Sequence, residues 1–109
     1  MRLADVYLFG RKAGRLEERD DGIFCFRYYG EYLASEDPIA VSLTMPLGDT
    51  VWESPTLMPF FDGLIPEGWL LDVAENTWKI DRRDRMGLLL ACCRDCIGAA
   101  SIREVDDGE

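Results

Sequence analysis

The positions of the prolines constrain the fold of this chain more than any other feature. All five prolines lie between residues 38 and 66 of the 109-residue sequence. Proline lacks a backbone N–H and fixes φ, so this stretch is expected to be extended and rich in turns. The sequence before it is β-prone and alternates like strands, and the sequence after it has helical spacing. Strands are therefore expected first and helices second.

Three antiparallel strands joined by short polar turns are expected in the first third of the chain. They are expected over Asp5–Phe9, Ala13–Glu17 and Ile23–Tyr28, with the first turn at Gly10–Lys12. In the third strand Phe24, Phe26 and Tyr28 share one face, and this aromatic face is expected to lie in the core. A helical turn over Tyr29–Leu33 and a fourth strand over Ile39–Thr44 are expected to follow.

Helices are expected in the second half. A short one begins near Thr56–Pro59 and ends at Leu64, and a longer one covers Glu67–Trp78. At 100° per residue this second helix turns Leu70, Ala74 and Thr77 toward the core and leaves Trp69 at the rim of the apolar arc. Asp84 is a candidate N-cap for a central, buried helix that ends near Cys93.

A final strand over about Gly98–Ile102 is expected to return to the sheet. The fold class is therefore α+β, with a small, mainly antiparallel sheet and the helices of the second half packed on it. One domain is expected over residues 1–109, with its core over about residues 3–102 and a frayed acidic tail at Arg103–Glu109.

The charge is strongly asymmetric along the chain. The net charge is −9, and residues 31–81 hold ten acidic residues and one basic residue, Lys79. Nucleic-acid binding requires a basic face, so no direct contact with nucleic acid is expected. The acidic surplus serves solubility or steers the chain toward a basic partner. The longest apolar run, Met86–Cys93, is too short to span a membrane, so a cytoplasmic protein is expected.

The residues for common catalytic chemistry are missing from the sequence. The chain has no histidine, no G-x-G-x-x-G or Walker-type phosphate loop, and no kinase signature. Cys93 and Cys96 form a C-x-x-C pair that suggests a redox or metal role, but without an export signal the four cysteines are expected to be buried, reduced thiols. An interaction module without catalytic residues, cofactor or metal is therefore favoured over an enzyme.

Two stretches of the sequence resemble the N-terminal subdomain of the HipA-type toxin kinases. The first is Met58–Gly68, which resembles the Pro-x-Phe-Phe-x-x-Leu-Leu-Pro-Glu-Gly segment of that family, with Ile65 in place of the second leucine. The second is Arg-Asp-Cys-x-Gly-Ala at Arg94–Ala99, preceded by Cys93 where glycine is common. The resemblance extends over about residues 3–102 and does not include a kinase portion.

The resemblance implies the small antitoxin component of three-component HipBST toxin–antitoxin systems. It would bind and neutralise a separate HipT-like serine/threonine kinase toxin, with a HipB-like DNA-binding protein in the same complex. Trp69 is the expected anchor at this interface, because exposed tryptophan is a preferred interface residue, and Glu67 and Asp72 are its expected polar rim. Two alternatives remain: a subdomain of a longer HipA-type kinase with a structural role, and local packing of Trp69 on the proline-rich segment.

Overall fold

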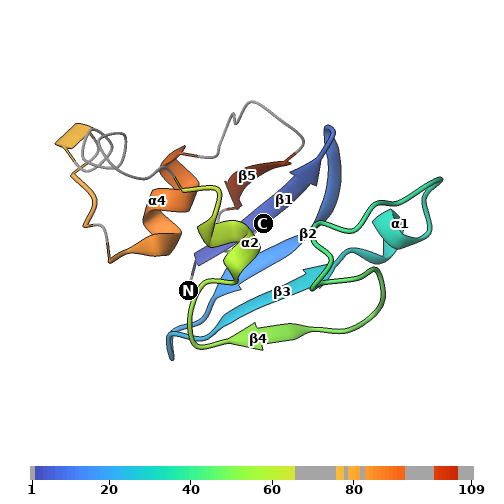
Figure 1. Ribbon diagram of the computed structural model, residues 1–109, viewed down its shortest axis with the longest axis horizontal. Coiled ribbons are helices and arrows are strands. Elements are labelled where there is room, and N and C mark those ends of the chain that lie inside the picture. Colours follow the sequence, from blue (N-terminus) through green and yellow to red (C-terminus); the bar gives the residue numbers. More distant parts are fainter. Residues whose placement is uncertain (1, 66–75, 78, 82, 93–99, 106–109) are drawn as a thin grey trace.

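A computed structural model describes residues 2–65, 76–77, 79–81, 83–92 and 100–105. Its centre is a five-stranded sheet in the order β4-β3-β2-β1-β5, in which every neighbouring pair is antiparallel (Figure 1). The strands are β1 (Arg2–Leu8), β2 (Arg11–Glu18), β3 (Phe24–Tyr28), β4 (Trp52–Ser54) and β5 (Ala100–Val105). The helices are α1 (Gly30–Leu33), α2 (Pro59–Asp62) and α4 (Arg85–Cys92). The expected α+β class, the three-strand meander and the returning last strand are confirmed.

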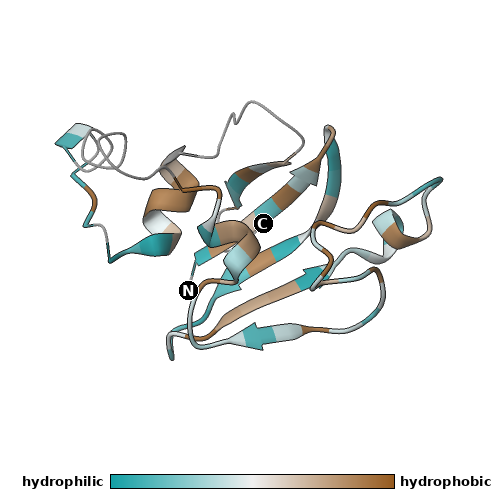
Figure 2. Cartoon of the chain, viewed as in Figure 1, coloured by the Kyte–Doolittle hydropathy of each residue, from teal (hydrophilic) through white to brown (hydrophobic). Residues whose placement is uncertain are grey.

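The core lies between one face of the sheet and the helices α2 and α4. The side chains of Phe24, Phe26 and Tyr28 on this face are buried, as the alternation predicts. Phe61 of α2 packs on Phe26 with ring centroids 5.4 Å apart. Figure 2 shows α4 as mostly hydrophobic, and its Met86, Leu88 and Leu89 are fully buried, so the central helix that the sequence predicts is also confirmed.

The first hairpin has a tighter turn than expected. Leu8 pairs with Arg11, so only Phe9 and Gly10 lie in the loop, and the predicted turn over Gly10–Lys12 is wrong. Both loop residues have positive φ, 49° for Phe9 and 78° for Gly10. This is the conformation of a type I′ turn, whose twist matches that of the two strands. Phenylalanine is an unusual residue for the first position of such a turn.

The fourth strand lies elsewhere than expected. Ile39–Thr44 is not a strand, because the chain reverses there: the Met45 N–H donates to the Ser42 carbonyl at 3.1 Å, and Pro46 has no N–H to continue a ladder. Strand β4 at Trp52–Ser54 pairs with β3 instead. Its three residues are too few for an alternating pattern to be recognised in the sequence.

Two smaller expectations are also corrected. Strand β5 continues through Arg103 to Val105, which pairs with Leu3, so these residues are part of the sheet rather than of a frayed tail. The Arg103 guanidinium lies over the Tyr7 ring, 5.4 Å from its centroid, which explains why a polar residue extends the strand. Thr77 is helical but exposed, so its predicted core position is wrong.

Candidate partner interface

The sequence places the candidate interface residues between α2 and α4. Glu67, Trp69 and Asp72 lie outside the described residues, as do the cysteines at 93 and 96 and most of the helix predicted over Glu67–Trp78. The structure does describe residues on either side of this part of the chain. On the N-terminal side is Ile65, three positions after the last residue of α2, and on the C-terminal side is Asp84, which directly precedes α4.

On the N-terminal side, α2 and Ile65 are held by packing. Helix α2 begins at Pro59, in a first turn where the missing proline N–H costs nothing. Phe61 and Ile65 are buried, and the Phe60 and Phe61 rings meet edge to face with centroids 5.2 Å apart. Trp69 is four positions after Ile65 in the sequence. The proposed anchor is therefore close in sequence to a residue of the core.

On the C-terminal side, Asp84 is held by charged hydrogen bonds. The Asp84 carboxylate accepts the Gly87 backbone N–H at 3.1 Å, so the predicted N-cap of α4 is confirmed. The Arg2 guanidinium donates two hydrogen bonds to the same carboxylate, at 2.6 and 3.1 Å, and a third to Glu18 at 2.6 Å. These bonds hold the pKa of Asp84 below its usual value and raise that of Arg2. Strand β1 and helix α4 are thereby joined.

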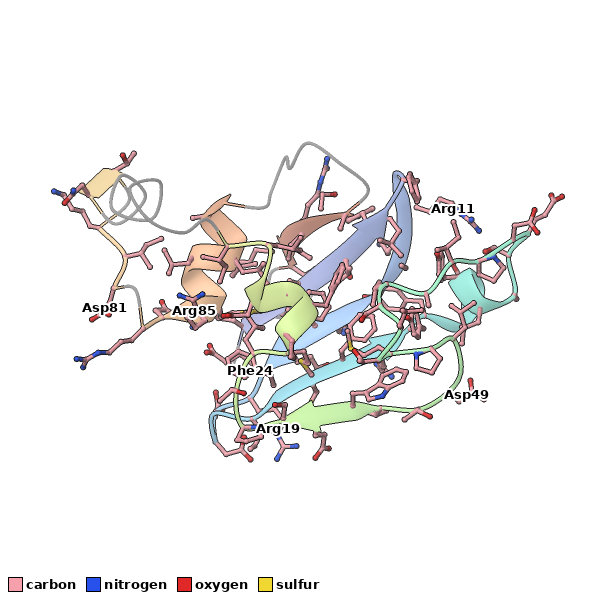
Figure 3. The ribbon with its side chains drawn as sticks, in the orientation of Figure 1. Arg11, Arg19, Phe24, Asp49, Asp81 and Arg85 are labelled. Carbon is pink, nitrogen blue, oxygen red and sulfur yellow. The ribbon has the colours of Figure 1, made fainter. Side chains whose placement is uncertain are left out.

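A second ion pair joins the two helices that border the candidate interface. Arg85 Nε, at the first position of α4, donates to Asp62 Oδ1, at the last position of α2, over 2.7 Å. Figure 3 shows Arg85 where α4 faces α2. The two helices on either side of the chain segment that contains Trp69 are therefore joined to each other. A partner that binds this segment would meet a pre-organised base.

The face of the sheet that α2 and α4 leave uncovered carries a different set of residues. A shallow hollow of about 620 Å³ is lined by Asp5, Lys12, Arg15, Tyr29, Gly30, Glu31 and Val105. The buried Asp5 carboxylate accepts the Tyr29 hydroxyl and lies 3.6 Å from Lys12 Nζ, and Arg15 Nε donates to the Tyr29 oxygen at 3.0 Å. Burial, and then the bond to Asp5, raises the pKa of Tyr29.

The charges of the side chains that line this hollow balance one another. Its charged side chains sum to zero, because Lys12 and Arg15 offset Asp5 and Glu31, so it does not call for a charged ligand. Asp5 was not predicted as a site residue, although a carboxylate between the apolar Ala4 and Val6 is a signal for a buried network. Among the described residues no group of three or more metal-ligating side chains occurs, and Cys25 is a buried free thiol.

No helix in the described part of the chain is both long enough and apolar enough to cross a membrane.

Comparison with known proteins identifies the architecture. Residues 4–103 match the family model described as "HipA N-terminal domain". An uncharacterized protein of Haemophilus influenzae is 35% identical over 104 residues, which cover 95% of this chain and 93% of the relative. A solved structure described as "N-terminal domain of HipA toxin" is 30% identical, with a TM-score of 0.74, and the match covers 98% of this chain and 95% of that one.

Proposed function

This chain belongs to the HipA N-terminal domain family, and on that basis we propose that it is an antitoxin of the HipS kind. It binds a separate HipT-like serine/threonine kinase toxin and neutralises it by protein–protein contact in the cytoplasm. A HipB-like DNA-binding protein is the third member of the proposed complex. The observation that carries the proposal is the extent of the family match, which spans residues 4–103 and nearly the whole of a HipA N-terminal domain.

The absence of kinase residues from the sequence supports this assignment. A HipA N-terminal domain alone lacks the catalytic part of the kinase. Phosphoryl transfer depends on a phosphate cradle and metal-binding carboxylates, and the sequence has no motif for either. A chain of this kind can act on a kinase by binding it, and cannot replace it.

We propose Trp69 as the anchor of the interface, with Glu67 and Asp72 as the polar rim around it. The geometry at the two ends of this segment supports the choice, because Ile65 is buried and Asp84 is held by Arg2. A pre-organised base reduces the entropy lost when the segment binds a partner. The acidic residues at 67, 72 and 75 would attract a partner whose surface is basic.

Co-expression with the kinase is the decisive experiment. A HipT-like kinase would be induced alone and together with this chain, and growth and phosphate incorporation into the kinase would be followed. Restored growth together with a stable complex in size-exclusion chromatography is the expected result. If the kinase remains toxic, or requires this chain for activity, the structural alternative is correct and the chain is a part of a HipA-type kinase.

A further inference from the structure

The connection between α1 and β4 exposes an unusual amount of apolar surface. Its Ile39, Leu43, Leu47 and Val51 are 50%, 100%, 37% and 52% exposed. In the described part of the chain, the only other large apolar side chain with such exposure is Phe9. Single exposed apolar residues are common on proteins, but a concentration of them in one segment marks an interaction surface.

Two tyrosine hydroxyls hold the backbone of this connection. The Tyr32 hydroxyl donates to the Ile39 carbonyl at 2.7 Å and accepts the Ile39 N–H at 2.9 Å. The Tyr28 hydroxyl donates to the Met45 carbonyl and accepts the Val41 N–H at 3.0 Å. The two rings are stacked, with centroids 6.2 Å apart. Hydrogen bonds from two core tyrosines, rather than contacts at the surface, therefore hold the backbone of this connection in place.

Leu43 lies at the tip of a closed turn within this segment. The Met45 N–H donates to the Ser42 carbonyl at 3.1 Å, and the Ser42 and Thr44 hydroxyls lie 3.0 Å apart. Val41, just before the turn, and Met45, its last residue, are buried, while Leu43 is fully exposed. Because the backbone of the turn is already fixed, Leu43 can be buried by a partner with little loss of backbone conformational entropy.

The charge of the connection between α1 and β4 favours a basic partner, although Arg11 of β2 donates to the Glu36 and Asp37 carbonyls at one end of it. The sequence has no basic residue between Arg27 and Lys79, and the carboxylates of Glu36, Asp37 and Asp49 in the same connection are exposed. Figure 3 shows Asp49 on the outer side of the connection. A second copy of this chain would bring a net charge of −9 against another −9, so self-association is disfavoured.

We propose that the Ser42–Met45 turn is a second docking element, which inserts Leu43 into an apolar pocket with a Lys- and Arg-rich rim on the kinase toxin. The identity of the partner rests on the proposed function, and the presence of the docking element rests on the geometry of the turn. The contact is separate from the one assigned to Trp69, so each can be removed while the other is kept.

Binding of the purified chain to the purified HipT-like kinase tests the proposal by biolayer interferometry. Leu43→Ser is expected to weaken binding by about tenfold or more, mainly through a faster off-rate. Leu43→Met is expected to keep most of the parent's affinity for the kinase, because methionine fills irregular apolar pockets. Phe9→Asn is the matched control, since it removes an exposed apolar side chain from outside the connection.

The outcomes separate the two proposals. A Leu43→Ser variant that melts like the parent and binds the kinase as tightly as the parent overturns the docking element and leaves the antitoxin assignment intact. A parent chain that does not bind the kinase overturns the proposed function and this inference with it. Sedimentation analysis adds a third result: self-association of the parent that Leu43→Ser abolishes would assign the turn to a second copy and overturn the kinase as its occupant.

Discussion

Arg2 and Asp84 are 82 positions apart in the sequence and share two hydrogen bonds, one to each carboxylate oxygen. Asp84 also caps α4 through the Gly87 N–H. One carboxylate thus begins the buried helix and fastens it to the first strand. The two side chains are 35% and 38% exposed, so solvent screens the attraction, and its contribution to stability is about 1 kcal/mol rather than that of a buried pair.

The Arg2–Asp84 pair is predicted to make stability depend on acid pH. The hydrogen bonds from Arg2 lower the pKa of Asp84 from its ordinary value of 3.8, so the stabilisation is present above that value and is lost as pH falls below it. Asp84→Asn should lower the urea midpoint at pH 7 and flatten the loss of stability in acid. Glu104→Gln, an exposed change on β5, is the control; equal pH profiles for Asp84→Asn and the parent would contradict the prediction.

Tyr28→Phe is predicted to destabilise the protein by about 1–3 kcal/mol, because the Val41 N–H and the Met45 carbonyl lose their partner in the interior. Hydrogen exchange at Val41 should accelerate by more than exchange at the centre of β2. Tyr7→Phe, on the uncovered face of the sheet, is the matched control. An unchanged exchange rate at Val41 would show that the connection does not depend on the hydroxyl.

The same variant tests the alkaline limit of stability. Burial raises the pKa of Tyr28 above its ordinary value of 10.0, so the unfolded chain loses this proton at a lower pH than the folded one, and stability declines as pH rises past that value. Tyr28→Phe should reduce the alkaline decline without abolishing it, because burial raises the pKa of Tyr29 as well. A decline equal to that of the parent would contradict this.

Phe9→Asn is predicted to stabilise the protein by about 1 kcal/mol, because asparagine adopts positive φ more readily than other residues with a Cβ atom. Phe9 has φ of 49° and a side chain that is 68% exposed, so the change removes strain and sacrifices little packing. Thermal and urea unfolding measure the gain. Phe9→Tyr keeps the strain and should leave stability near that of the parent, whereas a destabilised Phe9→Asn would mean that the ring packs usefully.

The sequence was most informative where structure depends on neighbours along the chain. The alternation of Phe24, Phe26 and Tyr28 predicts which face is buried, and Asp84 is identifiable as an N-cap by its place before an apolar run. Both features arise within one strand or one helical turn. The order of strands and helices follows for the same reason, since proline positions limit what each stretch can form.

Apart from the returning strand β5, features that depend on distant residues were not predicted. Strand β4 exists because β3 offers an open edge to Trp52–Ser54, and no pattern within three residues reports that. The hydroxyls of Tyr28 and Tyr32 bind backbone groups 7 to 17 positions away, so their effect on Ile39–Met45 is not visible in the periodicity. The local apolar run predicted a strand over Ile39–Thr44, but the hydrogen bonds from Tyr28 and Tyr32 hold this stretch in a turn.

Charge steering is predicted to speed association with the kinase. Neutralising Glu67, Asp72 and Glu75 together should lower the on-rate at low salt, and raising the ionic strength should lower the on-rate of the parent. Asp106→Asn, Asp107→Asn and Glu109→Gln make a control with the same change in net charge in the C-terminal tail. If both triple variants slow association equally, net charge is responsible rather than the position of the carboxylates.

Trp69→Ala is predicted to be the most damaging single change for binding. A buried tryptophan anchor contributes about 2 kcal/mol or more, so the dissociation constant for the kinase should rise by about thirtyfold or more, and cells should lose protection from the toxin. The fold should survive, because Ile65, Asp62 and Asp84, which hold the two ends of the segment, are untouched. Trp69→Phe keeps an aromatic ring and should retain part of the affinity. If Trp69→Ala unfolds the chain, tryptophan packs on its own segment; if it binds and neutralises like the parent, the anchor lies elsewhere.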